Sequence, residues 1–156
     1  MIHKASIIGL AALSLAIGAA PASAGDEARH YVPSAPPADA AKAPPFSNGV
    51  LVGNTFYVAG HIGMDPKTQK AATDVDTEAH LVLDAVKETL GHAGLTMDDL
   101  VSVTIYCTDL TLYYGFNAIY RTYFHGRYPA RAFIGVNQLV RGARFEIAGT
   151  AVKPLK

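Results

Sequence analysis

Tyr128–Val152 reads YPARAFIGVNQLVRGARFEIAGTAV and contains two strand-like segments near the end of the chain. The apolar pattern predicts one strand over Arg131–Val136 and a second over Ala143–Val152. Arg131 opens the first segment, and Glu146 lies inside the second. A guanidinium can bind a carboxylate through two hydrogen bonds, and a glutamate can transfer protons. Together they suggest chemistry on a small carboxylate substrate.

The sequence leaves two possible partners for the Arg131 side chain. A guanidinium between two alanines needs a counter-charge, which either a bound carboxylate or an internal salt bridge with Glu146 would supply. The spacing allows a hairpin that brings the two side chains together. It equally allows them to meet across a subunit boundary.

Upstream of this stretch, strands alternate with amphipathic helices. Strands are expected at 50–52, 55–59 and 100–108, and helices from Asp74 or Asp76 to about Ala93 and from Thr111 to about Phe124. This order predicts one α+β domain, a mixed sheet with two helices on one face. The other face would carry Val, Ile and Phe side chains without a helix to cover them, which favours burial by oligomerisation.

The N-terminus has the parts of a secretory signal peptide. Lys4 precedes an apolar run over residues 5–20, and small residues follow as far as Ala24. The run is shorter than the ~20 residues needed to span a bilayer. We therefore expect cleavage after Ala24, a periplasmic or secreted protein, and no membrane attachment of the mature chain.

Residues 25–43 are rich in Pro and Ala without apolar periodicity, which is typical of a flexible leader, so the compact domain is expected over 44–156. Loss of residues 1–24 removes Lys4 alone from the 13 basic residues and leaves all 13 acidic ones. This balance argues against nucleic-acid binding, which needs several cations on one face.

The sulfur and imidazole groups show no metal pattern. Cys107 shares the parity of the apolar positions in its predicted strand and is expected to be a buried small hydrophobe. The six histidines have no metal-ligand spacing, so no metal site is predicted. His61 follows Gly60 at the edge between a strand and a loop. It could face a ligand or be a hydrogen-bonded structural histidine.

Several segments together resemble the Rid family, the YjgF-type enamine/imine deaminases that are also labelled endoribonuclease L-PSP. The resemblance covers residues 44–153 in the same order. Its segments are Pro44–Val50 (PPFSNGV), Phe56–Gly63 (FYVAGHIG), Ala93–Leu95, Asn117–Tyr120 (NAIY), and Tyr128–Arg131 (YPAR) with Glu146.

The resemblance implies a chorismate-mutase-like α+β subunit that assembles into a barrel-shaped homotrimer with clefts between neighbours. It implies that Arg131 binds the substrate carboxylate, that Glu146 acts on the attacking water, and that Asn117 is a supporting polar residue. No metal or organic cofactor is implied.

Four positions depart from the family pattern around the implied cleft. Ala59-Gly60-His61 stands where members often have Ser-Gly-Gln, Phe133 stands where a Cys follows the arginine, and Phe46 stands where a Tyr is frequent. These residues, with Gly60, are expected to line the substrate site. The changes predict a less polar pocket.

The resemblance predicts hydrolysis of enamine or imine intermediates of amino acids to 2-oxo acids and ammonia. An alternative is a non-catalytic trimer that binds a small carboxylate in the same cleft, which the changes at Ala59, His61 and Phe133 would suit. A ribonuclease is a third possibility from the family label, and the neutral charge and predicted export argue against it.

Overall fold

Alternating apolar positions form a six-stranded sheet in the computed structural model, which describes residues 28–34 and 44–154. The strands are β1 (Arg29–Pro33), β2 (Ser47–Val52), β3 (Thr55–Ile62), β4 (Leu100–Cys107), β5 (Ala130–Gly135) and β6 (Phe145–Val152). Their order in the sheet is β1-β2-β3-β6-β4-β5. The β4 and β5 strands are parallel, and the other neighbouring pairs are antiparallel. The predicted mixed sheet is confirmed.

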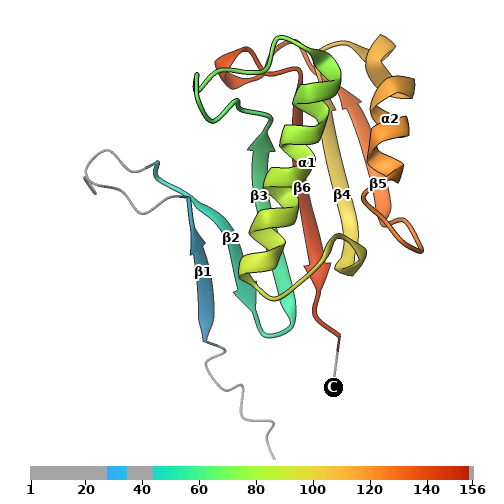
Figure 1. Ribbon diagram of the computed structural model, residues 1–156. Coiled ribbons are helices and arrows are strands. Elements are labelled where there is room, and N and C mark those ends of the chain that lie inside the picture. The colour runs from blue at the N-terminus through green and yellow to red at the C-terminus, as the bar shows by residue number, and fades with distance from the viewer. Residues whose placement is uncertain (1–27, 35–43, 155–156) are drawn as a thin grey trace, which may run out of the picture.

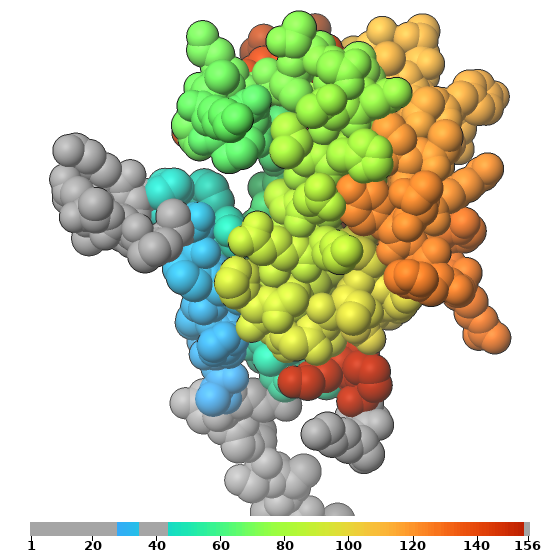
Figure 2. Space-filling model, in the orientation of Figure 1, coloured from blue at the N-terminus to red at the C-terminus, as the bar shows by residue number. Residues whose placement is uncertain are grey.

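Two helices, α1 (Val75–His92) and α2 (Tyr113–Arg121), lie on the same face of this sheet (Figure 1). In the space-filling view, α1 covers the middle of that face (Figure 2). Short 3-10 turns occur at Met97–Asp99, Leu110–Leu112 and Val140–Gly142. The predicted α+β class with two helices on one face is therefore confirmed.

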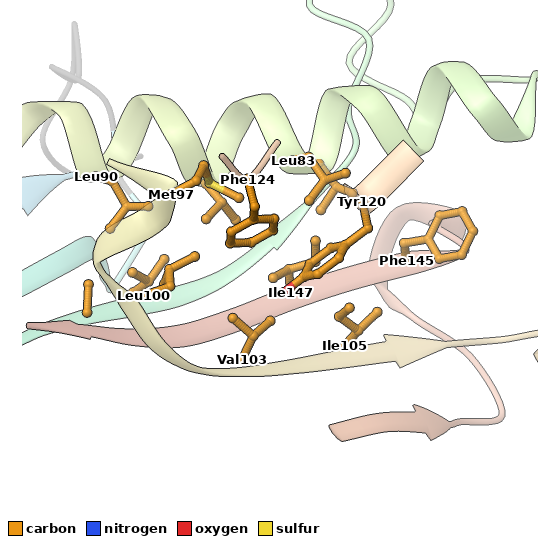
Figure 3. Packing of buried hydrophobic residues seen from close by; sticks show 14 of the residues in the cluster. Leu83, Leu90, Met97, Leu100, Val103, Ile105, Tyr120, Phe124, Phe145 and Ile147 are labelled. Carbon is orange, nitrogen blue, oxygen red and sulfur yellow. The ribbon is translucent and has the colours of Figure 1, made fainter. Parts of the chain in front are cut away.

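Helix α1 begins where the sequence predicts it. The Asp74 side chain accepts a hydrogen bond of 2.7 Å from the backbone N–H of Thr77, which satisfies one of the unpaired donors of the first turn. The helix ends before Gly94, whose φ of +70° suits a glycine. Its apolar stripe packs on the sheet together with α2 residues (Figure 3).

Helix α2 is shorter than predicted at both ends: it begins at Tyr113, after the 3-10 turn Leu110–Leu112, and it ends at Arg121 rather than Phe124. The Asp109 side chain accepts a hydrogen bond from the backbone N–H of Thr111 and so caps this turn. The predicted apolar stripe is confirmed, since Phe116 and Tyr120 are buried in the core. Cys107 is also buried, as predicted, with its Sγ 3.1 Å from the Asp109 carbonyl oxygen.

The opposite face of the sheet carries no helix among the described residues (Figure 1). Its large exposed apolar side chains include Tyr57 and Ile134, which are 54% and 42% exposed. The expectation of Phe on this face is wrong: Phe56 and Phe145 face the helices and are fully buried. The uncovered face itself is confirmed.

Strand β1 corrects the predicted flexible leader over 25–43. Residues 29–33 pair with β2, and Val32 enters the core with 3% of its surface exposed. The segment reads RHYVP, and a single buried valine leaves almost no alternating pattern to detect. The strand is held mainly by its backbone hydrogen bonds with β2. The predicted signal peptide and leader residues 25–27 and 35–43 lie outside the described residues. No described helix is long and apolar enough to cross a membrane.

Candidate functional site

Arg131 is held against aromatic rings on the helix face of the sheet. In β5 it is in register with the buried Val103 of β4, so its side chain points toward α2. Its guanidinium carbon lies 4.7 Å from the ring centroid of Tyr120 and 5.8 Å from that of Phe133. Contacts of this length between a cation and a ring are attractive and fix the guanidinium in place.

A pocket of about 230 Å³ opens beside this guanidinium. Asn117 and Tyr120 of α2 line it, and the Asn117 Oδ1 and Tyr120 Oη atoms are buried without a hydrogen-bond partner among the described residues. Burial raises the pKa of Tyr120 to about 12, and the charge of Arg131 opposes that rise. The hydroxyl therefore stays protonated at neutral pH. The other lining residues are Tyr113, Arg121, Tyr128 and Pro129.

Glu146 lies on the other face of the sheet, between Ile62 of β3 and Tyr106 of β4 in register. Its carboxylate extends over Gly60. A Cβ at position 60 would overlap the Oε1 atom of Glu146, so only glycine leaves room for this placement. Ala59 and Gly60 form a bulge between Val58 and His61.

Strand β4 separates Arg131 from Glu146. Strands β5 and β6 flank β4 on its two sides, so they do not form the hairpin that the sequence allowed. Arg131 is in register with Val103 and Glu146 with Tyr106, three positions along the strand, which places them on opposite faces. An Arg131–Glu146 salt bridge within the subunit is thereby excluded.

A salt bridge with a fully buried carboxylate joins Arg144 to Glu78, and the sequence analysis missed it. The Arg144 Nε donates to Glu78 Oε2 at 2.7 Å, and the backbone N–H groups of Arg144 and Phe145 donate to Oε1 at 2.5 and 3.2 Å. Arg144 also donates to the carbonyls of Ala72 and Thr73. These bonds tie the start of β6 to α1, one residue before Glu146.

A signal for this salt bridge was present in the sequence. Glu78 lies one helical turn before Val82 on the buried stripe of α1, where a carboxylate is expected only with a partner. The arginine that pairs with Glu78 is 66 positions away, so the helix sequence alone could not identify it.

His61 lies on the helix face of the sheet, apart from Glu146. The bulge at Ala59-Gly60 shifts the alternation of β3 by one position, so that His61 pairs with Ile147 and faces α1. Its side chain is 8% exposed and does not share a face with Glu146. The imidazole thus lies apart from the predicted substrate site in the subunit.

The remaining predicted site residues fall into two groups. Phe133 packs edge-on against Tyr113 and Phe116, with centroid distances of 5.0 and 5.7 Å, on the Arg131 side. Phe46 is exposed just before β2. The described chain therefore presents two separate groups of predicted site residues: one around Arg131 and Asn117, and one around Glu146 and Gly60.

This α+β fold, with an arginine on one face of the sheet and a glutamate on the other, belongs to a defined class. The model of the family described as Endoribonuclease L-PSP matches residues 37–153, and the chain belongs to this family. Solved members of the same fold carry the names YjgF and RidA.

Three relatives show the range of these similarities. The human protein named 2-iminobutanoate/2-iminopropanoate deaminase is 38% identical over 118 residues, covering 72% of this chain and 86% of its own. The YjgF gene product of E. coli superposes with a TM-score of 0.69 at 31% identity, over 80% of this chain and 94% of its own. The structure of E. coli TdcF with bound serine has a TM-score of 0.69 at 29% identity, with the same coverage.

Proposed function

We propose that this protein hydrolyses 2-imino acids, and the enamines in equilibrium with them, to 2-oxo acids and ammonia. Water adds to the imine carbon while the nitrogen gains a proton, and the C–N bond of the resulting carbinolamine then breaks to release ammonia. The substrate is already reactive, so catalysis requires positioning and proton transfer more than activation.

The observation that carries this proposal is that Arg131 is partly buried and has no carboxylate partner among the described residues. The Arg131 guanidinium is held over the Tyr120 ring. A partly buried cation without a counter-charge is suited to a carboxylate ligand, which can accept two parallel hydrogen bonds from it. The Asn117 amide beside it offers a further polar contact.

The separation of Arg131 and Glu146 supports a site shared between subunits. The exposed Tyr57 and Ile134 lie on the same uncovered face as Glu146, and apolar surface of this kind is usually buried in an assembly. In the proposed homotrimer, the Arg131 half of one subunit meets the Glu146 half of its neighbour. Glu146 then accepts a proton from the attacking water and returns one to the leaving nitrogen.

Two comparisons support this class of substrate. Relatives at 38% and 40% identity, from human and rat, are named 2-iminobutanoate/2-iminopropanoate deaminase. The structural neighbour TdcF holds serine, which presents an amino-acid carboxylate. A carboxylate next to a reactive C=N group is the common feature of the proposed substrates.

The test is ammonia release from freshly generated 2-iminobutanoate by the purified full chain. Arg131→Ala should lower kcat/KM by about 10- to 100-fold, because it removes charged hydrogen bonds worth ~1.5–3 kcal/mol. Arg127→Ala, at an exposed position outside the pocket, is the matched control and should retain activity. Wild-type turnover no faster than the uncatalysed reaction, with 2-oxobutanoate still bound through Arg131, would instead establish a binding protein.

A further inference from the structure

A second cavity lies at the opposite edge of the sheet from Arg131. It has a volume of about 530 Å³ and lies between β1, the β2–β3 pair and α1. Figure 2 shows β1, in blue, beside the C-terminal half of α1 at this edge of the molecule. No residue lines both this cavity and the Arg131 pocket. The two sites are therefore separate.

His61 and Thr89 are the two buried polar side chains that line this cavity. The His61 side chain is 8% exposed, and its Nε2 atom has no hydrogen-bond partner among the described residues. Burial lowers the pKa of His61, and a hydrogen bond with the Asn48 backbone and the charge of Glu88 act in the opposite direction. A neutral imidazole has one donor and one acceptor nitrogen, so with its proton on Nδ1 the unpartnered Nε2 of this cavity-lining side chain is an acceptor.

The rim of the cavity has one sign of formal charge. Glu88 is its only carboxylate, 79% exposed, and no Lys or Arg is among its described lining residues. His30 and His92 also lie on the rim. The walls include the apolar side chains of Val32, Pro33 and Ala85. A ligand that fits must donate hydrogen bonds, carry positive charge and present a short apolar body.

A metal ion is the other species that histidines and a carboxylate suggest. Within residues 28–34 and 44–154, no group of three His, Cys, Asp or Glu side chains is arranged to hold one. An ammonium group needs no such convergence, because each of its N–H donors can reach a different acceptor. The observations therefore favour an organic cation over a metal.

We propose that this cavity binds a small primary ammonium compound, whose N–H groups donate to His61 Nε2 and whose charge faces Glu88. An unpartnered acceptor buried in a cavity is costly until a donor reaches it, and an ammonium ion supplies that donor. The site does not depend on the deamination chemistry proposed above.

The experiment is a calorimetric titration of the full chain at pH 7.5 with propylammonium chloride. Propanol and sodium propionate serve as neutral and anionic probes of the same size. Saturable binding of propylammonium is expected, and Glu88→Gln and His61→Leu should each weaken it about tenfold or more. Glu88 is exposed, so its variant tests the site without threatening the fold.

Two further variants complete the design. Asp76→Asn removes an exposed acid of α1 that does not line the cavity and should leave propylammonium binding unchanged. Arg131→Ala should do the same, which would separate this site from the substrate pocket. Equal binding of propionate, absence of saturable binding, or binding that survives both Glu88→Gln and His61→Leu would each overturn the proposal.

Discussion

Arg131 and Glu146 point to opposite faces of one sheet, with strand β4 between their strands. The proposed shared site therefore takes its arginine and its glutamate from different subunits. Arg131→Ala and Glu146→Gln should each be nearly inactive alone. When the two variants are co-expressed, some interfaces pair the intact Arg131 of a Glu146→Gln chain with the intact Glu146 of an Arg131→Ala chain. Those interfaces should be active. Random mixing should return about a quarter of wild-type activity, measured by ammonia release.

The same mixing experiment has a direct control. Wild-type chain is mixed with either variant, and the measured activity gives the value expected for random assembly. Sedimentation shows whether mixed oligomers form. If mixed oligomers form and activity stays at the level of the separate variants, the shared site is wrong.

Gly60 is expected to be essential for the position of Glu146. Gly60→Ala places a methyl group where the Glu146 carboxylate lies, while the backbone at position 60 does not have a positive φ and tolerates alanine. Displacement of a catalytic carboxylate should lower kcat/KM by about 10- to 100-fold with the fold retained. Steady-state kinetics and circular dichroism measure the two effects.

Gly91→Ala is the matched glycine control. Its added Cβ meets nothing within 4 Å, and the position is in α1, where alanine is favoured over glycine by about 0.5–1 kcal/mol. It should raise the free energy of unfolding slightly and leave kcat/KM unchanged. Full activity of Gly60→Ala would remove Glu146 from the proposed chemistry.

The Glu78–Arg144 salt bridge should dominate the stability of the start of β6. Glu78→Gln leaves the partly buried Arg144 guanidinium without its counter-charge, which should lower the free energy of unfolding by about 3 kcal/mol. Glu88→Gln, at an exposed position of the same helix, should change it by less than about 0.5 kcal/mol. Urea denaturation provides both values. A loss below 1 kcal/mol for Glu78→Gln would contradict a structural role for this pair.

The Tyr120→Phe variant distinguishes the effect of the Tyr120 hydroxyl from that of its ring. The ring that supports Arg131 is retained, and a buried hydroxyl without a described partner is removed. Because such a group costs about 1–3 kcal/mol, the variant should be as stable as wild type or more stable. If thermal unfolding shows the variant to be clearly less stable, the hydroxyl has a partner in the assembled protein.

His61 should make stability depend on pH below its ordinary pKa of 6.5. Burial lowers its pKa in the folded state below the ordinary value of 6.5, so the unfolded chain binds more protons in this range. The contribution of the neutral ring is present above pH 6.5 and is lost as the pH falls toward the folded pKa. His61→Leu should remove this part of the slope, measured by denaturation at several pH values.

The comparison isolates His61 from its neighbours. His30, Glu88 and His92 face the same cavity and are unchanged in the variant, so their contributions cancel in the difference. The lowered pKa of the Asp74 carboxyl acts below its ordinary value of 3.8, well under the 6.5 of His61. Identical slopes for His61→Leu and wild type would show that the ring is not held neutral.

Local patterns predicted most elements of the fold. The cap at Asp74, the stripe of α1 and the parity of Cys107 depend on residues within a few positions of one another, so the sequence states them directly. Strand β1 was missed because its single buried residue, Val32, leaves no alternation to read. The pairing of that strand depends on β2, which begins only at Ser47.

The site was predicted less completely, because its geometry depends on strand order. Arg131 and Glu146 stand out in the sequence, and their separation follows from β6 lying between β3 and β4. Their opposite faces follow from the register of each strand with β4. The face of His61 depends on a one-residue bulge, which inverts every side chain after it. Neither feature has a signature in the residues themselves.

The aromatic support of Arg131 also affects the entropy of ligand binding. A free arginine side chain samples many rotamers, and ordering it costs about 2 kcal/mol. Here the rings of Tyr120 and Phe133 restrict that sampling before any ligand arrives. The Arg131 side chain thus loses its rotamer entropy on folding rather than on binding. More of the interaction energy with a carboxylate therefore contributes to affinity.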